Sequence, residues 1–507
     1  MVFPVVGGDG KPTGYEIDNS MRFNRGDAAC LRKTFSGSPT STKICTISFW
    51  TKLADPSNTD AKAIFSAIKS GVNEDVIKFM GVNNGILNGI EINFNNTGDG
   101  SMMISSGNST LIKLRDPSAW YHIVIAIDSS QGTASNRVKV YINGTQFDTE
   151  ARVEGGSVAD DVALSQNYEL GFLTASAHSI GENVESAGNE PYDGYLADFH
   201  FVDGQQLAPT TFAETDDNGV WIPKDCKDDL TYGNYGFFLE FKQTGTSANS
   251  SGMGADTSGN DNHFTPTNLQ SDGRHITTDT PTNNFCTMNP LTASSRATFS
   301  NGNTKLTLNL QNSVPYGQVE FGNFFVNKGK WYYEVFVVEN GAGGQVVFGW
   351  NEKYEDGGYF NGHNNLGSSG NVYYGDDGHI RDGSVGETTA PDTYADSDII
   401  GIALDLDNHK FYAHKNGTYQ SNGSGTGNPS NGTNGYTVTS AYNDYWTPWI
   451  SKDSDNASHN PTANFNFGNG LNVPSSGNSD ANGYGNFEYA VPTGYYSLCT
   501  KNLAEYG

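Results

Sequence analysis

Two short polar segments have the residue types that could bind a hard cation. Residues 256–261 read Asp-Thr-Ser-Gly-Asn-Asp, and residues 376–378 read Asp-Asp-Gly. Calcium prefers several oxygen ligands, which both segments supply. The first segment has Asp261 and Thr267 where a helix-loop-helix calcium loop has its glycine and its bidentate glutamate. Both segments also suit ordinary turns, so the sequence predicts no required cofactor and leaves bound calcium as an open alternative.

Catalytic residues are harder to find. The sequence has no G-x-S-x-G nucleophile motif, no H-E-x-x-H zinc motif and no G-x-x-x-x-G-K-[ST] phosphate loop. A glycosidase needs two carboxylates about 5 to 10 Å apart, whereas Glu91 and Glu334 are single acids, which we expect at a rim or on a sheet face. His409 and His414 are an odd number of residues apart, so we expect them on opposite, solvent-facing sides of a hairpin. The sequence therefore predicts that the protein is not an enzyme.

The charge balance excludes one class of partner. The 507 residues carry 56 acidic and 29 basic side chains, a net charge of −27. Nucleic-acid binding needs clustered Lys and Arg, so nucleic acid is not an expected partner. The sequence has no run of about 18 apolar residues, which argues against membrane insertion. The first ten residues do not resemble a secretory signal, and we expect synthesis in a cytoplasm without export by the general route.

The cysteines give no sign of a disulfide framework. There are five, at positions 30, 45, 226, 286 and 499, and they are widely spaced and odd in number. None forms a C-x-x-C pair or a cluster with zinc-ligand spacing. We expect them to act as small apolar side chains in or near cores.

The elements that must position all these residues are expected to be β-strands. Residues 121–128 and 399–406 place apolar side chains at alternate positions, and their other faces are partly apolar as well, which predicts strands covered on both sides. Asn-Gly pairs at 143–144 and 416–417 can supply the positive φ angles of a tight type I′ hairpin. Long helical patterns are absent. The sequence predicts an all-β protein with two antiparallel, jelly-roll-like β-sandwich domains.

Composition divides the chain into four parts. Residues 1–20 are crowded with Gly and Pro and are expected to form an extended arm, a natural anchor to other proteins. Residues 21–205 and 292–507 hold most of the expected strands, and residues 206–291 are expected to form a partly ordered connector. The sequence of residues 281–291 in the connector is weakly similar to that of residues 498–503, and this similarity would mark equivalent docking segments.

The first expected sandwich resembles laminin-G-like domains of the concanavalin-type jelly-roll group. The resemblance covers nearly all of residues 21–205, and it implies a fold while saying little about a ligand. It is carried by an early Ser-Phe-Trp strand, a Trp-Tyr-His strand entry, a Tyr-Ile-Asn-Gly hairpin and a closing strand, at Thr46–Lys52, Trp120–Val124, Val138–Gly144 and Tyr192–Phe201.

The second expected sandwich resembles a SPRY domain. It departs from compact family members in one place, a long polar insertion at Gln420–Tyr436, which we interpret as a contact surface or a flexible tip. The motifs that carry the resemblance occur in order at Gly329–Val335, Val346–Trp350, Tyr374–Gly378, Ile400–Asn408, Lys415–Gly417, Asn466–Gly468 and Pro492–Tyr495.

Four tyrosines are the candidate contact residues. Tyr354, Tyr359, Tyr373 and Tyr374 lie in or beside loops between the SPRY-like strands. The resemblance implies that this region helps to form a partner-binding surface, and Tyr side chains stack well on sugars and on partner side chains. We therefore expect these residues to bind a partner or a glycan, with ordinary loop packing as the alternative.

The combination of the two domain types resembles structural proteins of marine tailed bacteriophages. Connector phrases such as residues 279–291 and the terminal phrase 492–503 support this resemblance. It implies a non-enzymatic, acidic virion surface protein, such as a tail fibre, an appendage or a capsid decoration, that is assembled in the host cytoplasm. Its partners would be other virion proteins, a host receptor or glycan, and further copies of itself. The alternative is a glycan-binding or glycan-degrading extracellular protein.

Overall fold

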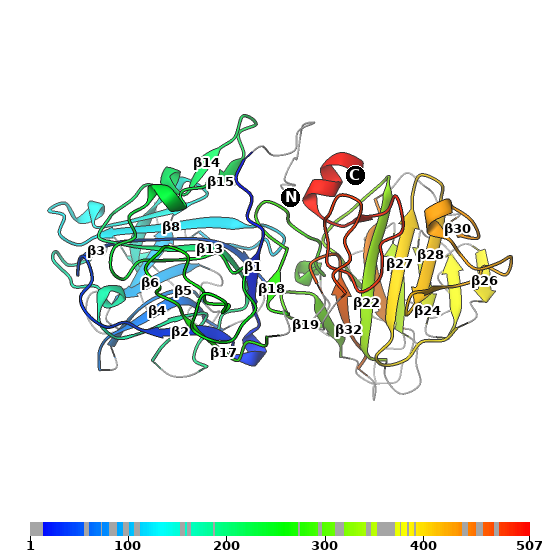
Figure 1. The fold of residues 1–507 in the computed structure, drawn as a ribbon, viewed down its shortest axis with the longest axis horizontal. Helices are drawn as coiled ribbons and strands as arrows, with labels where there is room; N and C mark the ends of the chain where they lie inside the picture. Colours follow the sequence, from blue (N-terminus) through cyan, green and yellow to red (C-terminus); the bar gives the residue numbers. More distant parts are fainter. Residues whose placement is uncertain are drawn as a thin grey trace. The chain divides into compact units, whose positions relative to one another are not determined.

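The computed structural model divides the chain into two compact units. The first unit ends at Thr282 and the second begins at Asn283. Figure 1 shows that nearly all of the regular secondary structure in both is β-strand, joined by loops. The structure describes residues 14–54, 60–71, 73–80, 89–94, 101–105, 112–152, 158–159, 164–185, 188–271, 274–292, 297–309, 319–340, 346–351, 371–375, 377–382, 385–389, 392–438, 445–452, 460–470 and 476–507.

The first unit is an antiparallel β-sandwich. One layer has the order β9-β8-β3-β13-β1-β18 and the other the order β7-β6-β5-β4-β12-β2-β17. Strand β10 joins them, because its first half pairs with β9 and its second half with β7. The strands are β1 (Ser20–Phe23), β2 (Cys30–Thr34), β3 (Ile44–Leu53), β4 (Lys62–Ser70), β5 (Asn73–Phe79), β6 (Ile90–Phe94), β7 (Ser101–Ser105), β8 (Tyr121–Asp128), β9 (Val138–Ile142), β10 (Thr145–Arg152), β11 (Val158–Ala159), β12 (Ala177–Ile180), β13 (Gly194–Asp203), β14 (Ala213–Thr215), β15 (Trp221–Pro223), β16 (Phe237–Leu239), β17 (Thr265–Thr267) and β18 (Ile276–Thr277).

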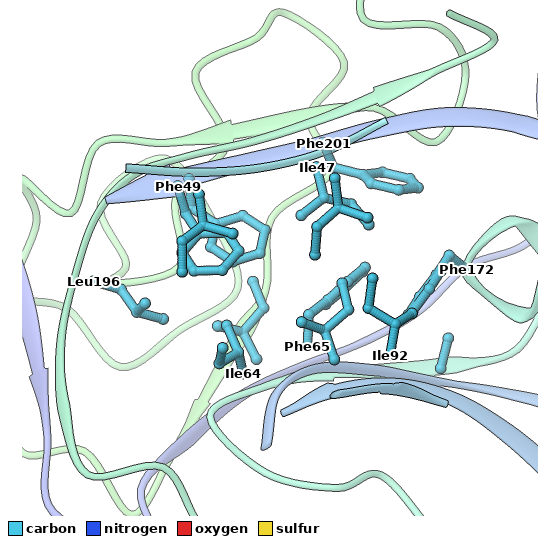
Figure 2. Close-up of a cluster of buried hydrophobic side chains, with 14 of the residues drawn as sticks. Ile47, Phe49, Ile64, Phe65, Ile92, Phe172, Leu196 and Phe201 are labelled. Carbon is cyan, nitrogen blue, oxygen red and sulfur yellow. The ribbon is translucent and has the colours of Figure 1, made fainter. Parts of the chain in front are cut away.

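The core of the first unit lies between these two layers. Ile47 and Phe49 of β3 point down toward Ile64 and Phe65 of β4 (Figure 2), and all four are fully buried. Phe65 stacks on Phe172 with ring centroids 5.1 Å apart. Each such side chain contributes roughly 1.5–3 kcal/mol through its removal from water. In β3 every second residue faces this core, which explains the alternating pattern there. In β4 an irregularity between residues 63 and 65 accompanies the burial of the adjacent Ile64 and Phe65 in the same core.

Much of the stretch that we expected to be a connector is part of the first sandwich. Strand β16 pairs with β13, β17 pairs with β2, and β18 pairs with β1. A fully buried ion pair joins Asp279, just after β18, to Lys52 of β3 with Nζ and Oδ2 2.8 Å apart. Residues 206–282 therefore supply strands and core contacts to the first unit.

The second unit is also a two-layered β-sandwich. One sheet has the order β19-β20-β32-β22-β27-β28-β29 and the other the order β21-β31-β23-β24-β25-β26. Trp331, Trp350 and Phe465 are fully buried in its core. The strands are β19 (Ala297–Ser300), β20 (Lys305–Leu308), β21 (Val319–Phe321), β22 (Lys330–Glu339), β23 (Val346–Asn351), β24 (Asn371–Gly375), β25 (His379–Asp382), β26 (Val385–Thr389), β27 (Ile399–Asp405), β28 (Lys410–Lys415), β29 (Thr418–Tyr419), β30 (Tyr436–Thr437), β31 (Thr447–Lys452), β32 (Thr462–Asn466) and β33 (Tyr496–Ser497).

The fold class expected from the sequence is confirmed. Both Asn-Gly pairs have two positive φ angles, 47° and 77° at Asn143 and Gly144, and 48° and 82° at Asn416 and Gly417. Within the described part of the chain the only α-helix is α1 (Thr500–Tyr506). No helix among the described residues is long and apolar enough to cross a membrane. The remaining helical turns are the 3-10 helices η1 (Arg25–Asp27), η3 (Ala134–Asn136), η4 (Gly171–Leu173), η5 (Pro209–Thr211), η6 (Lys227–Asp229), η7 (Pro290–Thr292) and η8 (Pro429–Asn431).

The two similar sequence segments, residues 281–291 and 498–503, are hydrogen-bonded to each other. The Cys286 N–H donates to the Leu498 carbonyl at 2.9 Å, and the Thr500 N–H donates to the Asn284 carbonyl at 2.8 Å. The Asn284 N–H in turn donates to Thr500 Oγ1 at 3.0 Å. The start and the end of the second unit are thereby hydrogen-bonded together.

The polar insertion of the second unit has a defined conformation. Asn428 accepts a hydrogen bond from the Asn431 N–H, which caps η8, and Gly432 follows with a φ of 76°. The Tyr436 hydroxyl closes the segment by donating to the Ser421 carbonyl at 2.5 Å. Side chains that bond to nearby backbone groups thus shape this surface segment.

Candidate binding cleft

A polar cleft of about 310 Å³ lies on the first unit at the edge formed by β1 and β18. We call it the β1–β18 cleft. Its lining comes from η1, which follows β1, and from residues 268–270 and 274–275, which lie between β17 and β18 in the sequence. Each of its lining residues has a polar side chain, which suits a ligand that forms many hydrogen bonds. These residues are Asp27, Asn268, Gln270, Arg274 and His275.

Buried Arg22 of β1 holds one wall of the cleft. Its N–H donates to the His275 carbonyl at 2.7 Å, and its Nη2 donates to the Arg274 carbonyl at 2.5 Å. On the other side the Asn268 amide donates to the Ala28 carbonyl at 3.2 Å. Asn268, Arg274 and His275 are therefore held by hydrogen bonds to segments about 250 residues away in the sequence.

The ring of His275 has a defined tautomer. Nδ1 lies 3.3 Å from the Arg22 carbonyl oxygen, which can only accept, so Nδ1 carries the proton. Nε2 is then an unprotonated acceptor, and it is buried without a hydrogen-bond partner in the described structure. Burial, and secondarily the Arg22 cation, lowers the pKa of His275, which favours this neutral form. His275 thus contributes a buried, neutral ring to the wall of the cleft.

A buried serine–histidine pair in the first unit is not set up for nucleophilic catalysis. The Trp221 indole N–H donates to Nδ1 of His122 at 3.1 Å, so the ring proton is on Nε2. Nε2 therefore donates to Ser48 Oγ, 2.9 Å away, and cannot remove its proton. Burial lowers the pKa of His122 to about 3, which keeps the ring neutral. The arrangement fits a structural hydrogen-bond network.

A second buried network crosses the second unit. The Gly417 N–H donates to Nδ1 of His414 at 3.2 Å, so Nε2 donates to the Tyr332 hydroxyl at 2.8 Å. That hydroxyl donates to Glu334 Oε1 at 2.9 Å. Burial raises the pKa of Glu334 to about 7, although hydrogen bonds from the backbone of residues 488–489 and from Tyr332 act against this rise. The side chains of His414, Tyr332 and Glu334 are all buried.

The acidic residues that the sequence offered as candidate cation ligands form hydrogen bonds and ion pairs within the protein. Among the described residues no group of three or more His, Cys, Asp or Glu could hold a metal ion. The Asp256 carboxylate accepts from the backbone N–H groups of Phe238, Ser258 and Asn262, which makes it a turn-forming residue. Asp377 forms an ion pair with Arg381 at 2.7 Å, and residue 376 lies outside the described residues.

Three expectations about single residues need comment. His414 is buried, so our prediction that it faces solvent is wrong: the aromatic cluster of Tyr332, Tyr412 and the segment 487–495 covers that face of its sheet. Glu91 and Glu334 are fully buried, which rules out rim positions. The five cysteines are buried and free, as predicted.

The predicted contact tyrosines belong to the second unit, whereas the β1–β18 cleft belongs to the first. Tyr354 and Tyr359 are outside the described residues. The backbone of Tyr373 lies in β24, opposite Gly349 of β23. Tyr374 is fully buried, and its hydroxyl donates to the Asp392 carbonyl, so a contact role does not fit this residue.

One comparison with known proteins matches part of the first unit. Residues 26–208 match the family model Laminin_G_3, described as the concanavalin A-like lectin/glucanases superfamily. This segment is thus similar to laminin-G-like domains. Of the residues that line the cleft, only Asp27 lies inside the matched range, so the cleft is built mainly by residues that follow the laminin-G-like region. No curated protein matches the chain.

Solved structures of two kinds are similar to parts of the chain. The SPRY domain of human HERC1 is 15% identical, covers 35% of this chain and 96% of its own, and has a TM-score of 0.26. A heptameric SAP-like pentraxin from Limulus polyphemus is 19% identical, covers 38% of this chain and 78% of its own, and has a TM-score of 0.25. SPRY domains, which the motifs of residues 292–507 resemble, are thus among the similar structures.

Little in the sequence indicated the cleft. Arg22 and His275 belong to segments that become neighbours only when β1 pairs with β18. A single histidine in a polar stretch has no spacing pattern that would single it out. The positive φ of 56° at Asn268 marks a sharp turn next to the cleft, and the Asn there is the one local signal.

Proposed function

We propose that this chain is a non-enzymatic attachment protein that binds a polar ligand in the β1–β18 cleft. The observation that carries the proposal is the cleft itself, a hollow whose lining side chains are all polar. The lectin/glucanase description of the matched family agrees with a binding role. The buried Ser48–His122 pair, in which the ring proton already points at the serine, supports the absence of catalysis.

The setting that we propose for this attachment protein is the surface of a tailed-phage virion. The support is the resemblance of the two domain types and of the connector phrases to phage structural proteins. Such a protein would contact other virion proteins and a host receptor. A net charge of −27 favours a soluble surface that repels copies of itself except at specific contacts.

Binding to cells tests the attachment role. Purified full-length protein, fluorescently labelled, should bind host cells in a saturable way, and unlabelled protein should compete. Mass spectrometry of purified virions should detect the chain. A protein that binds neither host cells nor isolated host envelope, and that is missing from virions, would contradict the proposal.

A glycan-degrading enzyme is the competing function, because the matched family description includes glucanases. The two are separated by incubating the full-length protein with host exopolysaccharide and measuring reducing ends. An attachment protein leaves the number of reducing ends unchanged. A steady increase that depends on protein concentration would establish an enzyme instead.

A further inference from the structure

We propose that Lys78 and Asn183 of the first unit become joined by a covalent amide bond, which forms between their side chains after the chain has folded. The bond replaces the amide nitrogen of the Asn183 side chain by Nζ of Lys78 and releases one ammonium ion. The two residues are about 100 positions apart in the sequence, so the bond closes a large loop within the first sandwich. This inference goes beyond the proposed attachment function and does not depend on it.

The starting observation is a glutamate that bridges the two side chains. Glu190 Oε1 accepts a hydrogen bond from Lys78 Nζ at 2.8 Å, and the other oxygen, Oε2, accepts one from Asn183 Nδ2 at 3.2 Å. One carboxylate thus binds both the nitrogen that attacks and the nitrogen that leaves. Groups held side by side in this way react far faster than the same groups free in solution.

The fold fixes this arrangement from two sides. Lys78 lies in β5, whereas Asn183 and Glu190 belong to the connection between β12 and β13. This connection is closed by the Asn183 N–H, which donates to the Asn189 carbonyl at 2.9 Å, and it is held on the sheet by the Ala63 N–H, which donates to the Glu190 carbonyl at 2.7 Å. Glu190 has a φ of 48°, a strained conformation for a residue other than glycine, and such strain is typical of functional positions.

The site is largely closed to water. Lys78, Asn183 and Glu74 are 9%, 3% and 4% exposed. Because a buried ammonium and a buried carboxylate are both costly to desolvate, transfer of one proton from Lys78 Nζ to Glu190 makes the two groups neutral and relieves this cost. The neutral amine is the nucleophile that the reaction needs. Exclusion of water also removes the competing attack that would hydrolyse the amide.

Two further groups activate the amide of Asn183. The Glu185 N–H donates to Asn183 Oδ1 at 3.2 Å, which stabilises the negative charge that develops on this oxygen as the amine attacks. On the other side of the amide, Glu74 Oε1 accepts from Asn183 Nδ2 at 2.7 Å. Burial raises the pKa of Glu74, which favours its protonated form. A carboxyl group of this kind beside the leaving nitrogen is suited to general-acid catalysis.

The reaction needs no cofactor and no oxidant. Lys78 Nζ forms a bond to Cγ of Asn183, and the bond between Cγ and Nδ2 breaks. Of the three protons on the lysine ammonium, one remains on the new amide nitrogen and two move to Nδ2, which leaves as ammonium. Glu190 can carry these protons, because its two oxygens contact the two nitrogens. A neutral amide thereby replaces a buried cation, and the charge is released to water.

Mass spectrometry of the intact full-length protein is the first test. The linked chain should be lighter than its sequence predicts by the mass of one ammonia molecule. A succinimide at an Asn-Gly pair loses the same mass, so a tryptic digest must show the link itself. We expect a branched peptide that contains both Lys78 and Asn183 and is not cleaved after Lys78. An intact protein of full mass, or a loss of ammonia found only in unbranched peptides, would overturn the inference.

Variants then test the role of each group. Lys78→Arg keeps a cation beside Glu190 but removes the primary amine, so this variant should have full mass and give no branched peptide. Glu190→Gln keeps the size of the side chain but removes the base, and the link should form about a hundredfold more slowly. Cell-free synthesis of the full-length protein with timed acid quenching gives the rates. The matched control is Glu214→Gln, the same change at an exposed residue of β14, which should form the link at the wild-type rate.

Folding of the variants is followed separately. Cys45, buried in β3, should resist thiol labelling in each correctly folded variant. A folded Glu190→Gln variant that forms the link as fast as the wild type would refute the role of Glu190. A loss of ammonia that persists in folded Lys78→Arg would place the reaction elsewhere and refute the inference. The branched peptide of the wild-type protein decides whether the bond exists even where a variant does not fold.

Discussion

The buried ion pair between Lys52 and Asp279 provides a quantitative test of how the first unit is held together. Their Nζ and Oδ2 atoms are 2.8 Å apart, and the side chains are 1% and 0% exposed. Trp120 adds an indole hydrogen bond to Asp279 Oδ1 at 3.1 Å. At an effective dielectric constant of about 20, two unit charges at this distance attract by roughly 6 kcal/mol. Asp279→Asn keeps the size of the side chain but removes the carboxylate charge that pairs with the Lys52 cation.

We expect Asp279→Asn to lower the free energy of unfolding of the first unit by about 3–5 kcal/mol, because removing one partner strands a buried charge. The matched control is Asp18→Asn, which breaks a pair with Lys242 at 3.5 Å whose side chains are 64% and 43% exposed. An exposed pair of this kind contributes at most about 1 kcal/mol. The two variants change the same chemical group and differ in burial.

The assay is denaturant unfolding of the full-length protein with pulsed thiol labelling and mass spectrometry. Cys45 reports on the first unit and Cys499 on the second, and both are buried and free. Asp279→Asn should move the transition at Cys45 and leave that at Cys499 in place. Replacing the cation as well, in Lys52→Met/Asp279→Asn, should restore most of the lost stability. A loss below about 1 kcal/mol, or a loss that persists in the double variant, would refute this reasoning.

Two further predictions concern buried histidines. Gly401→Ala would place a Cβ 1.9 Å from Nε2 of His414, so the free energy of unfolding of the second unit should fall by more than about 2 kcal/mol. Denaturant unfolding followed by thiol labelling of Cys499 measures this change. An unchanged unfolding midpoint would show that the His414 ring can move aside. In the first unit, burial lowers three histidine pKa values from about 6.5 to about 3 or 4. The unfolded chain therefore binds more protons below pH 6.5, and stability should fall as the pH decreases toward 4. Asp198, whose pKa burial raises to about 7, opposes this with one proton, so these four groups together contribute a slope of roughly 3 kcal/mol per pH unit. Unfolding of the first unit followed from pH 7 to pH 4 checks the slope, and stability that rises on acidification would contradict it. The three histidines are His122, His178 and His200.

Local sequence patterns predicted much of the strand architecture. The alternation in residues 121–128 and 399–406 reports directly on burial, and the Asn-Gly pairs report on backbone angles. The alternation in residues 121–128 also indicated that His122 is buried, which a search for catalytic motifs does not reveal. It shares a face with Val124 and Ala126, and a strand covered on both sides must bury the histidine as well.

Long-range pairing was beyond the reach of local patterns. The short strands β16, β17 and β18 have three, three and two residues, too few to show a period, and only their partners in the first sandwich explain their place. The cleft depends on the pairing of β1 with β18, so its residues gave no joint pattern in the sequence. Tyr374 was predicted to be a contact residue because it lies beside an expected loop, yet its side chain is buried in the core. The sequence around an aromatic residue in such a position does not tell whether it faces a core or a partner.

The hydrogen bonds between residues 284–286 and 498–500 have a consequence for engineering and for evolution. A module whose entry and exit points touch can be spliced into a surface turn of a host protein without stretching either flank. The same closure permits circular permutation, with new termini opened in the surface segment around η8 and the old ones joined by a short peptide. The second unit is thus suited to insertion into another protein as a module.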